Sequence, residues 1–233
     1  VYSLIRLGLP VKSKTRGWPE GLAFDFIEDQ RSNPAVLDTF ITTGHHDGVI
    51  TIHIAEADPL HRLQMRINLG EVYRTLLGHF RHESGHYYYS VLLEDHNLGD
   101  FRDLFGDERT DYTKALENYY SGSASAAWPP EFITAYAGSH PLEDWAECWA
   151  HYLLIHDVLE TAEAHGLVAA PPEFVGAIDH WRSLSITLNE LNRSMGLGDA
   201  YPFVITPDIE KKLTCVDAMI SRLRTSPPLT ATH

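Results

Sequence analysis

The chain has 233 residues, of which 44% are hydrophobic and 21% are charged, a composition typical of an ordinary globular protein. No apolar run approaches the ~18 residues that a membrane-spanning helix needs. The formal net charge of −14 argues against nucleic-acid binding, because affinity for phosphates comes from clustered Lys and Arg. We therefore expect neither a membrane span nor a nucleic-acid partner, and one domain over residues 1–224 with a disordered tail over residues 225–233.

The chain contains two cysteines, Cys148 and Cys215. Their spacing gives neither a C-x-x-C pair nor a disulfide framework. This usage predicts a reducing, cytoplasmic environment. Neither composition nor charge indicates an oligomeric state.

The first part of the chain predicts a small sheet over residues 22–55. Residues 22–27 have aromatic and branched side chains at strand length and form the first expected strand. Residues 37–43 and 49–55 flank a turn-rich segment, residues 44–48, and together predict a hairpin with a longer loop. We expect the second arm to be an edge strand that lies along a cleft and pairs with an extended substrate.

The predicted hairpin loop contains two adjacent histidines, His45 and His46. They have two interpretations, a second metal site or the polar residues of an exposed turn. We favour the second, because turn segments are rich in polar residues of this kind.

From Pro59 onward apolar residues recur at three- and four-residue spacing, the pattern of amphipathic helices. One helix is expected from about Leu69 to Leu93. Gly78 and Gly85 fall on one face of it, so we expect another backbone or the sheet to pass close to both. Later segments predict four further helices near residues 112–120, 158–165, 172–195 and 207–223, and a small-residue loop over residues 121–130 that forms a rim or lid.

The predicted helix contains an H-E-x-x-H motif, formed by His82, Glu83 and His86. Histidines four residues apart lie on one face of a helix, one turn apart, where both imidazoles can bind a single ion. Glu83 stands beside the first of them, where a carboxylate can take a proton from a metal-activated water. A five-residue motif also arises by chance, so its context has to decide.

A second group of chemically informative residues follows Pro141, which predicts the start of a helix with Ser139 or His140 as its N-cap. Glu143 and Glu147 share one face of this helix. Acidic residues suit a first turn because of the helix dipole, but Glu147 lies among tryptophan, alanine and cysteine side chains and needs a partner. Hydrolytic zinc sites use three protein ligands and leave one position for water, so this pair can supply the third ligand.

The two motifs together resemble the gluzincin branch of zinc metallopeptidases. Longer segments between Gly70 and Val204 are similar to a bacterial family of zinc-binding metallopeptidases, namely GEVYRTLLGHFRHESGHYYY, FRDLFGDER, AYAGSHPLEDWAECWAHYL and LNRSMGLGDAYPFV. That family usually has a cysteine-bearing zinc ribbon ahead of the peptidase domain, and this chain contains none. The resemblance implies an α+β, zincin-like fold with a small N-terminal sheet and a mainly helical remainder.

The resemblance also implies a ligand set for one Zn²⁺ ion, composed of His82, His86 and Glu143. Glu147 would then orient a ligand histidine. Because the two acids share a helix face, Glu147 remains the alternative third ligand. Two histidines and one carboxylate suit zinc in a hydrolase, and the sequence does not distinguish zinc from another divalent ion.

For catalysis, the resemblance implies that Glu83 is the general base of a peptidase that acts on peptide or protein substrates. Tyr136 lies seven residues before Glu143, the spacing of the transition-state tyrosine in lethal-factor-type toxin proteases. With help from His140, it would donate a hydrogen bond to the oxyanion. The alternative is a zinc-stabilised binding or regulatory module without turnover. Glu83 argues against that alternative, because a purely structural site has no need of a base.

Overall fold

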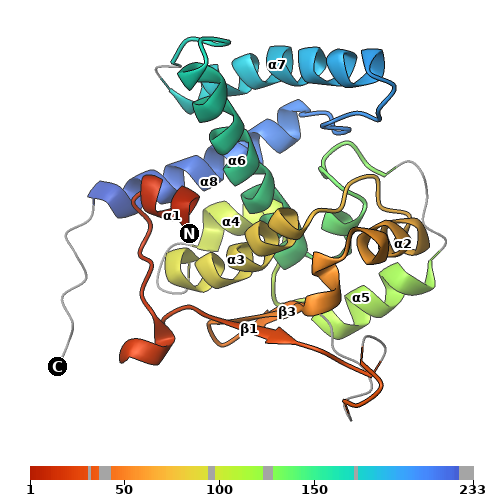
Figure 1. Cartoon of the computed structure of the whole chain (residues 1–233). Helices are drawn as coiled ribbons and strands as arrows, with labels where there is room; N and C mark the ends of the chain where they lie inside the picture. The colour runs from red at the N-terminus through yellow and green to blue at the C-terminus, as the bar shows by residue number, and fades with distance from the viewer. Residues whose placement is uncertain (31–32, 37–42, 94–97, 123–127, 171–172, 226–233) are drawn as a thin grey trace.

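Two helices that pack across each other, α3 (Leu76–Leu93) and α6 (Pro141–Ala164), form the centre of the fold (Figure 1). The computed structural model describes residues 1–30, 33–36, 43–93, 98–122, 128–170 and 173–225. The other α-helices in these ranges are α1 (Tyr2–Arg6), α2 (Pro59–Leu69), α4 (Leu98–Phe105), α5 (Tyr112–Ser121), α7 (Phe174–Ser194) and α8 (Pro207–Thr225). Together with one small sheet, they give an α+β fold, as predicted.

Helix α6 is buried along most of its length. His140 is its N-cap, as one of the two alternatives predicted, and Pro141 takes the first helical position. Trp145, Trp149 and Tyr152 are buried with it. A helix whose large apolar side chains are buried in this way packs inside a protein. It contacts α3, α7 and α8.

Gly85 permits the close packing of α3 on α6. A Cβ atom at Gly85 would lie 2.9 Å from Ala146 Cα and 3.1 Å from Trp149 Cβ. Two indoles of α6 donate to α3 at the same place, Trp145 Nε1 to Gly85 O (2.8 Å) and Trp149 Nε1 to Ser84 Oγ (3.0 Å). The predicted close approach is therefore confirmed at Gly85. It is wrong at Gly78, where the nearest atom is Thr75 Oγ1 of the preceding turn.

The sheet has three strands in the order β1-β3-β2 among the described residues. Strand β1 (Ala23–Ile27) runs parallel to β3 (Val49–His53), and β2 (Gly44–His46) runs antiparallel to it. Ile50 and Ile52 of β3 are buried. The prediction that residues 49–55 form an edge strand for substrate is wrong, because β3 is the central strand.

The hairpin turns at Asp47 and Gly48, which both have positive φ angles, 46° and 72°. An Asp-Gly pair in this conformation is typical of a two-residue hairpin. The predicted loop over residues 44–48 is thus wrong, and His45 and His46 lie in β2 instead. Of the predicted first arm, residues 37–42 lie outside the described residues.

The helix predicted from Leu69 to Leu93 begins too early, because residues 70–75 are not helical and separate α2 from α3. Helix α2 ends at Gly70, whose φ of 67° gives the left-handed C-cap. Helix α3 starts only at Leu76, and Thr75 Oγ1 accepts a hydrogen bond from Gly78 N in its first turn.

The second half of the chain follows the predicted helices with one exception. The segment predicted as a separate helix near residues 158–165 continues α6, whereas α7 and α8 match their predicted positions closely. In Figure 1, α7 and α8 lie on one side of α3, and the sheet lies on the other. Part of the predicted rim, residues 123–127, and most of the predicted tail, residues 226–233, fall outside the described residues, while Thr225 is the last residue of α8. No helix in the described part of the chain is long and apolar enough to cross a membrane.

Candidate metal centre

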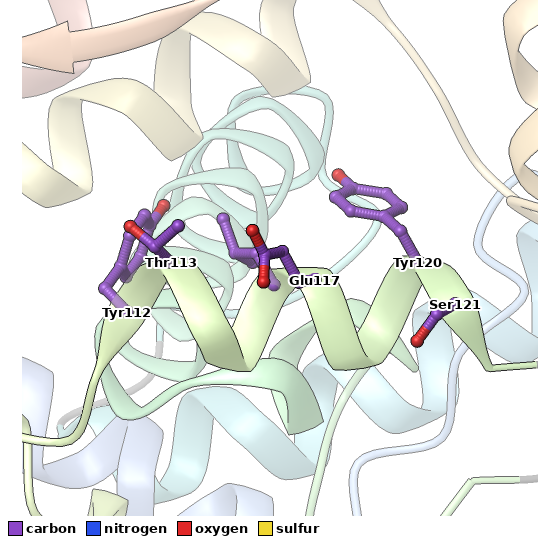
Figure 2. A pocket seen from close by; sticks show the side chains of 6 residues that line it. Tyr112, Thr113, Glu117, Tyr120 and Ser121 are labelled. Carbon is purple, nitrogen blue, oxygen red and sulfur yellow. The ribbon is translucent and has the colours of Figure 1, made fainter.

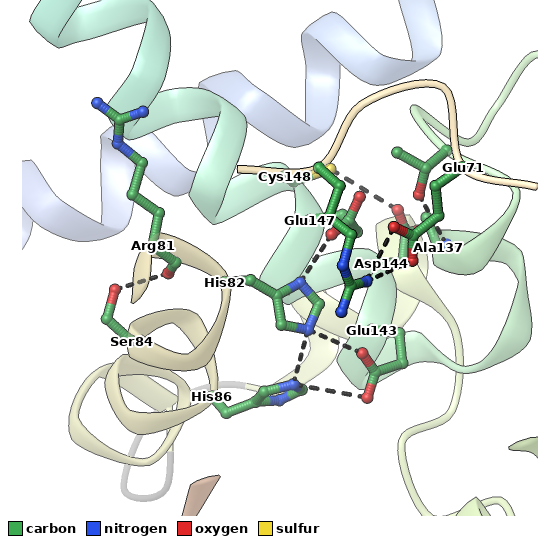
Figure 3. Close-up of polar contacts among 12 residues, drawn as sticks. Glu71, Arg81, His82, Ser84, His86, Ala137, Glu143, Asp144, Glu147 and Cys148 are labelled. Carbon is green, nitrogen blue, oxygen red and sulfur yellow. Dashed lines mark hydrogen bonds and ion pairs between the residues drawn. The ribbon is translucent and has the colours of Figure 1, made fainter. Parts of the chain in front are cut away.

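Helices α3 and α6 bring three potential metal ligands together (Figure 3). His82 and His86 lie one turn apart on α3, and their Nε2 atoms are 3.2 Å apart. Glu143, in the first turn of α6, places Oε2 3.0 Å from His82 Nε2 and Oε1 3.5 Å from His86 Nε2. The three side chains predicted as ligands therefore converge on one point.

The spacing of these atoms suits a divalent cation. Ligands at ~2.0–2.1 Å from a tetrahedral zinc ion stand about 3.3 Å apart, and the three observed distances, 3.0, 3.2 and 3.5 Å, lie around that value. Imidazole nitrogen and carboxylate oxygen are ordinary zinc ligands. A set of three leaves one coordination position for water or substrate.

Glu147 contacts the opposite nitrogen of His82. Its Oε1 lies 2.7 Å from His82 Nδ1, and a carboxylate there accepts a hydrogen bond from Nδ1–H and directs the Nε2 lone pair toward the centre. Burial disfavours the charged imidazole, but hydrogen bonds with Glu143 and Glu147 outweigh it and raise the pKa of His82 well above its ordinary value. The space between the two carboxylates therefore favours positive charge.

Glu143 is itself fully buried, with 0% of its surface exposed. Burial would raise the pKa of Glu143, but hydrogen bonds from His82 and His86 lower it far below the usual range. Tyr112 also donates to it, with its hydroxyl 2.5 Å from Oε1. Sequence reasoning missed Tyr112. No motif spacing relates it to Glu143, since the contact depends on the path of the chain between α5 and α6.

Glu83 is 7% exposed and follows His82 on α3. Burial, and after it the charge of Glu143, raise the pKa of both Tyr112 and Tyr136, and the charge of Glu83 adds to the effect. The predicted base thus shares one electrostatic environment with two tyrosine hydroxyls beside the ligands.

Tyr136 lies close to the predicted ligands. Its ring centroid is 5.9 Å from that of His82, and it packs edge-on against Tyr119 at 5.5 Å. His140, in contrast, uses both ring nitrogens on the backbone: Nδ1 accepts from Leu142 N, and Nε2 donates to Thr110 O, each at 3.1 Å. His140 is thus engaged as the cap of α6, and its predicted help at an oxyanion stays a prediction.

Asp144, the neighbour of Glu143, points to another part of the fold. Its Oδ2 lies 2.6 Å from Nζ of Lys212 on α8, and both side chains are buried. Lys212 also donates to Glu131 O at 2.7 Å. The turn that contains Glu143 is thus anchored to α8 as well as to α3.

The described residues contain one further group with ligand chemistry, formed by His156, Asp157 and Glu160. Arg81 donates to Asp157 at 2.6 Å, and Arg6 pairs with Glu160. These arginines already neutralise both carboxylates, so the group is a link between helices. Figure 3 shows Arg81 pointing away from His82.

His45 does not join the predicted ligands. Its Nε2 accepts from Gly48 N at 3.1 Å, and its ring packs edge-on against Tyr87 at 6.1 Å. Burial, and then the charge of His86, lower the pKa of His45 to about 4. It is a strand residue beside α3, in a position from which it supports the hairpin.

The chain matches the model of a family described as "Putative zinc-binding metallo-peptidase" over residues 1–219. It is 40% identical over 235 residues to the uncharacterized protein Rv2568c of Mycobacterium tuberculosis and, to the same extent, to the uncharacterized protein Mb2598c of Mycobacterium bovis. Each alignment covers 96% of this chain and 67% of the relative. No solved structure matches the chain significantly.

The family match covers most of the chain, including α3 and α6 with the three converging side chains. It therefore agrees with a site whose geometry suits zinc. The chain belongs to the "Putative zinc-binding metallo-peptidase" family.

Proposed function

We propose that this protein is a zinc-dependent peptidase in which His82, His86 and Glu143 hold one Zn²⁺ ion and Glu83 is the general base. The observation that carries the proposal is the convergence of three side chains, whose ligand atoms lie 3.0–3.5 Å from one another; Glu83, which is 7% exposed, directly follows the first of them in the chain. When bound, the ion would supply Lewis acidity, which activates water and polarises the scissile carbonyl.

Residues of the chain then transfer the proton, stabilise the carbonyl oxygen and orient a ligand. Glu83 takes a proton from the attacking water as the new C–O bond forms, and it delivers that proton to the amine nitrogen when the C–N bond breaks. Tyr136 donates a hydrogen bond to the carbonyl oxygen as negative charge grows on it. Glu147 holds the His82 ring through Nδ1, in the tautomer that keeps Nε2 free to bind the ion.

Metal content gives the first test. We expect one zinc ion per chain in the purified protein and its loss in His86→Ala, because a ligand is removed. His165→Ala, which changes an exposed histidine at the end of α6, is the matched control and should keep the ion. Elemental analysis of the three proteins checks this, and equal zinc in all three would refute the ligand set.

Cleavage of a peptide library gives the second test. Glu83→Gln should retain zinc but lose at least ~100-fold in cleavage rate, the usual contribution of a general base. Glu163→Gln, at an exposed position of α6, should cleave as the wild type does. Tyr136→Phe should lower kcat by ~100-fold with unchanged zinc content. If the zinc-loaded wild type shows no Glu83-dependent cleavage, the protein is a zinc-stabilised binding or regulatory module instead.

A further inference from the structure

Tyr112 connects the predicted metal centre to the surface. Asp111 caps α5 by accepting a hydrogen bond from Lys114 N, so Tyr112 is the first residue of the helix. It lines a surface pocket of about 530 Å³ together with Leu116 and Tyr120 of α5, and Figure 2 shows Tyr112 and Tyr120 on this helix. The Tyr112 side chain is partly exposed, but its hydroxyl contacts Glu143, which is fully buried.

The Tyr112 ring has a rigid support. It packs edge-on against His140 with the centroids 5.0 Å apart. Both nitrogens of His140 are bound to backbone atoms, on Thr110 and Leu142, so the histidine cannot turn without breaking the cap of α6. The position of the Tyr112 hydroxyl is therefore set by the same turn that presents Glu143.

The two oxygens of Glu143 have different environments. Oε2 faces His82 Nε2 at 3.0 Å, whereas Oε1 receives the Tyr112 hydroxyl at 2.5 Å. A hydroxyl that donates to a carboxylate at this distance forms a strong, charge-assisted hydrogen bond. It fixes the rotation of the carboxylate about its last bond, with Oε2 toward His82 Nε2 and Oε1 toward His86 Nε2 at 3.5 Å.

We propose that Tyr112 is a positioning residue that orients the ligand Glu143 for metal binding. The inference rests on the metal centre proposed above, but it does not depend on peptide hydrolysis. Hydrogen-bond partners of metal ligands typically contribute 10–100-fold to metal affinity. Tyr112→Phe removes the hydroxyl and keeps the ring on His140, so we expect zinc affinity to fall by about 10–100-fold.

The experiment uses the full chain and two readouts that do not depend on activity. Zinc dissociation constants come from competition with a chromogenic chelator, and the visible absorption spectrum of the Co²⁺-loaded protein reports ligand geometry. Tyr119→Phe is the matched control, since Tyr119 lies on the same helix and packs on Tyr136 rather than on Glu143. It should bind zinc within twofold of the wild type.

A double-mutant cycle separates positioning from a general effect on folding. If Tyr112 acts through Glu143, adding Tyr112→Phe to Glu143→Ala should change the remaining zinc affinity by less than twofold. Weaker zinc binding and an altered Co²⁺ spectrum in Tyr112→Phe alone would support the inference. An equal loss in both backgrounds would overturn it, as would unchanged affinity with an unchanged spectrum.

The outcomes also separate this inference from the proposed function. A wild type that binds zinc, shows the Tyr112 effect and cleaves no peptide would keep the positioning role and refute the peptidase. A wild type that takes up no zinc would refute both. If Tyr112→Phe lowers kcat with unchanged zinc affinity and Co²⁺ spectrum, Tyr112 acts on the substrate, and its positioning role is wrong.

Discussion

The packing of α3 on α6 makes Gly85 the most informative position for a stability test. In Gly85→Ala the new methyl carbon would lie 2.9 Å from Ala146 Cα, a backbone atom that cannot rotate away, and 3.1 Å from Trp149 Cβ. Overpacking of this kind costs up to ~3 kcal/mol, and replacing a helical glycine by alanine returns ~1 kcal/mol. We expect a net loss of about 2 kcal/mol in the free energy of unfolding, or about 4–8 °C in Tm.

Gly78→Ala is the matched control on the same helix. A Cβ atom there would meet only the Thr75 hydroxyl, at 2.9 Å, and the Tyr73 ring edge, at 3.9 Å. A side-chain hydroxyl can move, but this one accepts a hydrogen bond from Gly78 N, so its displacement offsets the helix-propensity gain and the variant should lie within ~1 kcal/mol of the wild type. Urea denaturation of the metal-free proteins measures both. If Gly85→Ala is as stable as Gly78→Ala, the close approach of the two helices is refuted.

Three further predictions concern buried polar groups. Lys212→Met should destabilise the protein by roughly 3–5 kcal/mol in thermal or urea unfolding, because it leaves the Asp144 carboxylate buried without its partner; a loss below ~1 kcal/mol would contradict this. For Glu56, burial would raise the pKa, but hydrogen bonds from His79 and from Arg74 outweigh this effect and lower the pKa to about 2. The ionised Glu56 carboxylate thus contributes about 3 kcal/mol to the free energy of unfolding, at ~1.4 kcal/mol per pH unit. This contribution is complete above pH ~4.5 and is lost as the pH falls toward 2. Glu56→Gln should therefore flatten the dependence of unfolding free energy on pH in that window, and an unchanged dependence would refute the shifted pKa of Glu56. His140→Asn should retain the cap and the peptidase activity, whereas His140→Ala should lose ~1 kcal/mol of stability; a large fall in kcat for the asparagine variant would instead support the oxyanion role.

The local chemistry of the site was readable from the sequence. Histidines at positions 82 and 86 share a helix face whatever the rest of the chain does, and Pro141 marks the start of α6 by its own backbone constraint. Because these signals depend only on neighbouring residues, the helix faces that carry the predicted ligands were predicted correctly. The α+β class is confirmed, because it too follows from local patterns of apolar residues. The catalytic roles of individual residues stay predictions.

The errors have a common physical cause. Apolar spacing continues across Gly70, so periodicity alone did not detect the left-handed cap that ends α2. The central position of β3 comes from its parallel pairing with β1, a contact between segments distant in sequence. Tyr112 reaches Glu143 across 31 positions. Contacts of this kind depend on the path of the whole chain, which local patterns do not encode.

Adjacent residues of α6 hold two different helices: Glu143 faces the imidazoles of α3, and Asp144 faces the ammonium group of Lys212 on α8. The first turn of α6 therefore connects α8 to the face of α3 that carries the predicted ligands. Loading the protein with zinc should slow amide hydrogen exchange in α8 as well as in α3, although no predicted ligand lies on α8. A truncation that removes α8 should likewise release zinc, since it frees the turn from which Glu143 projects.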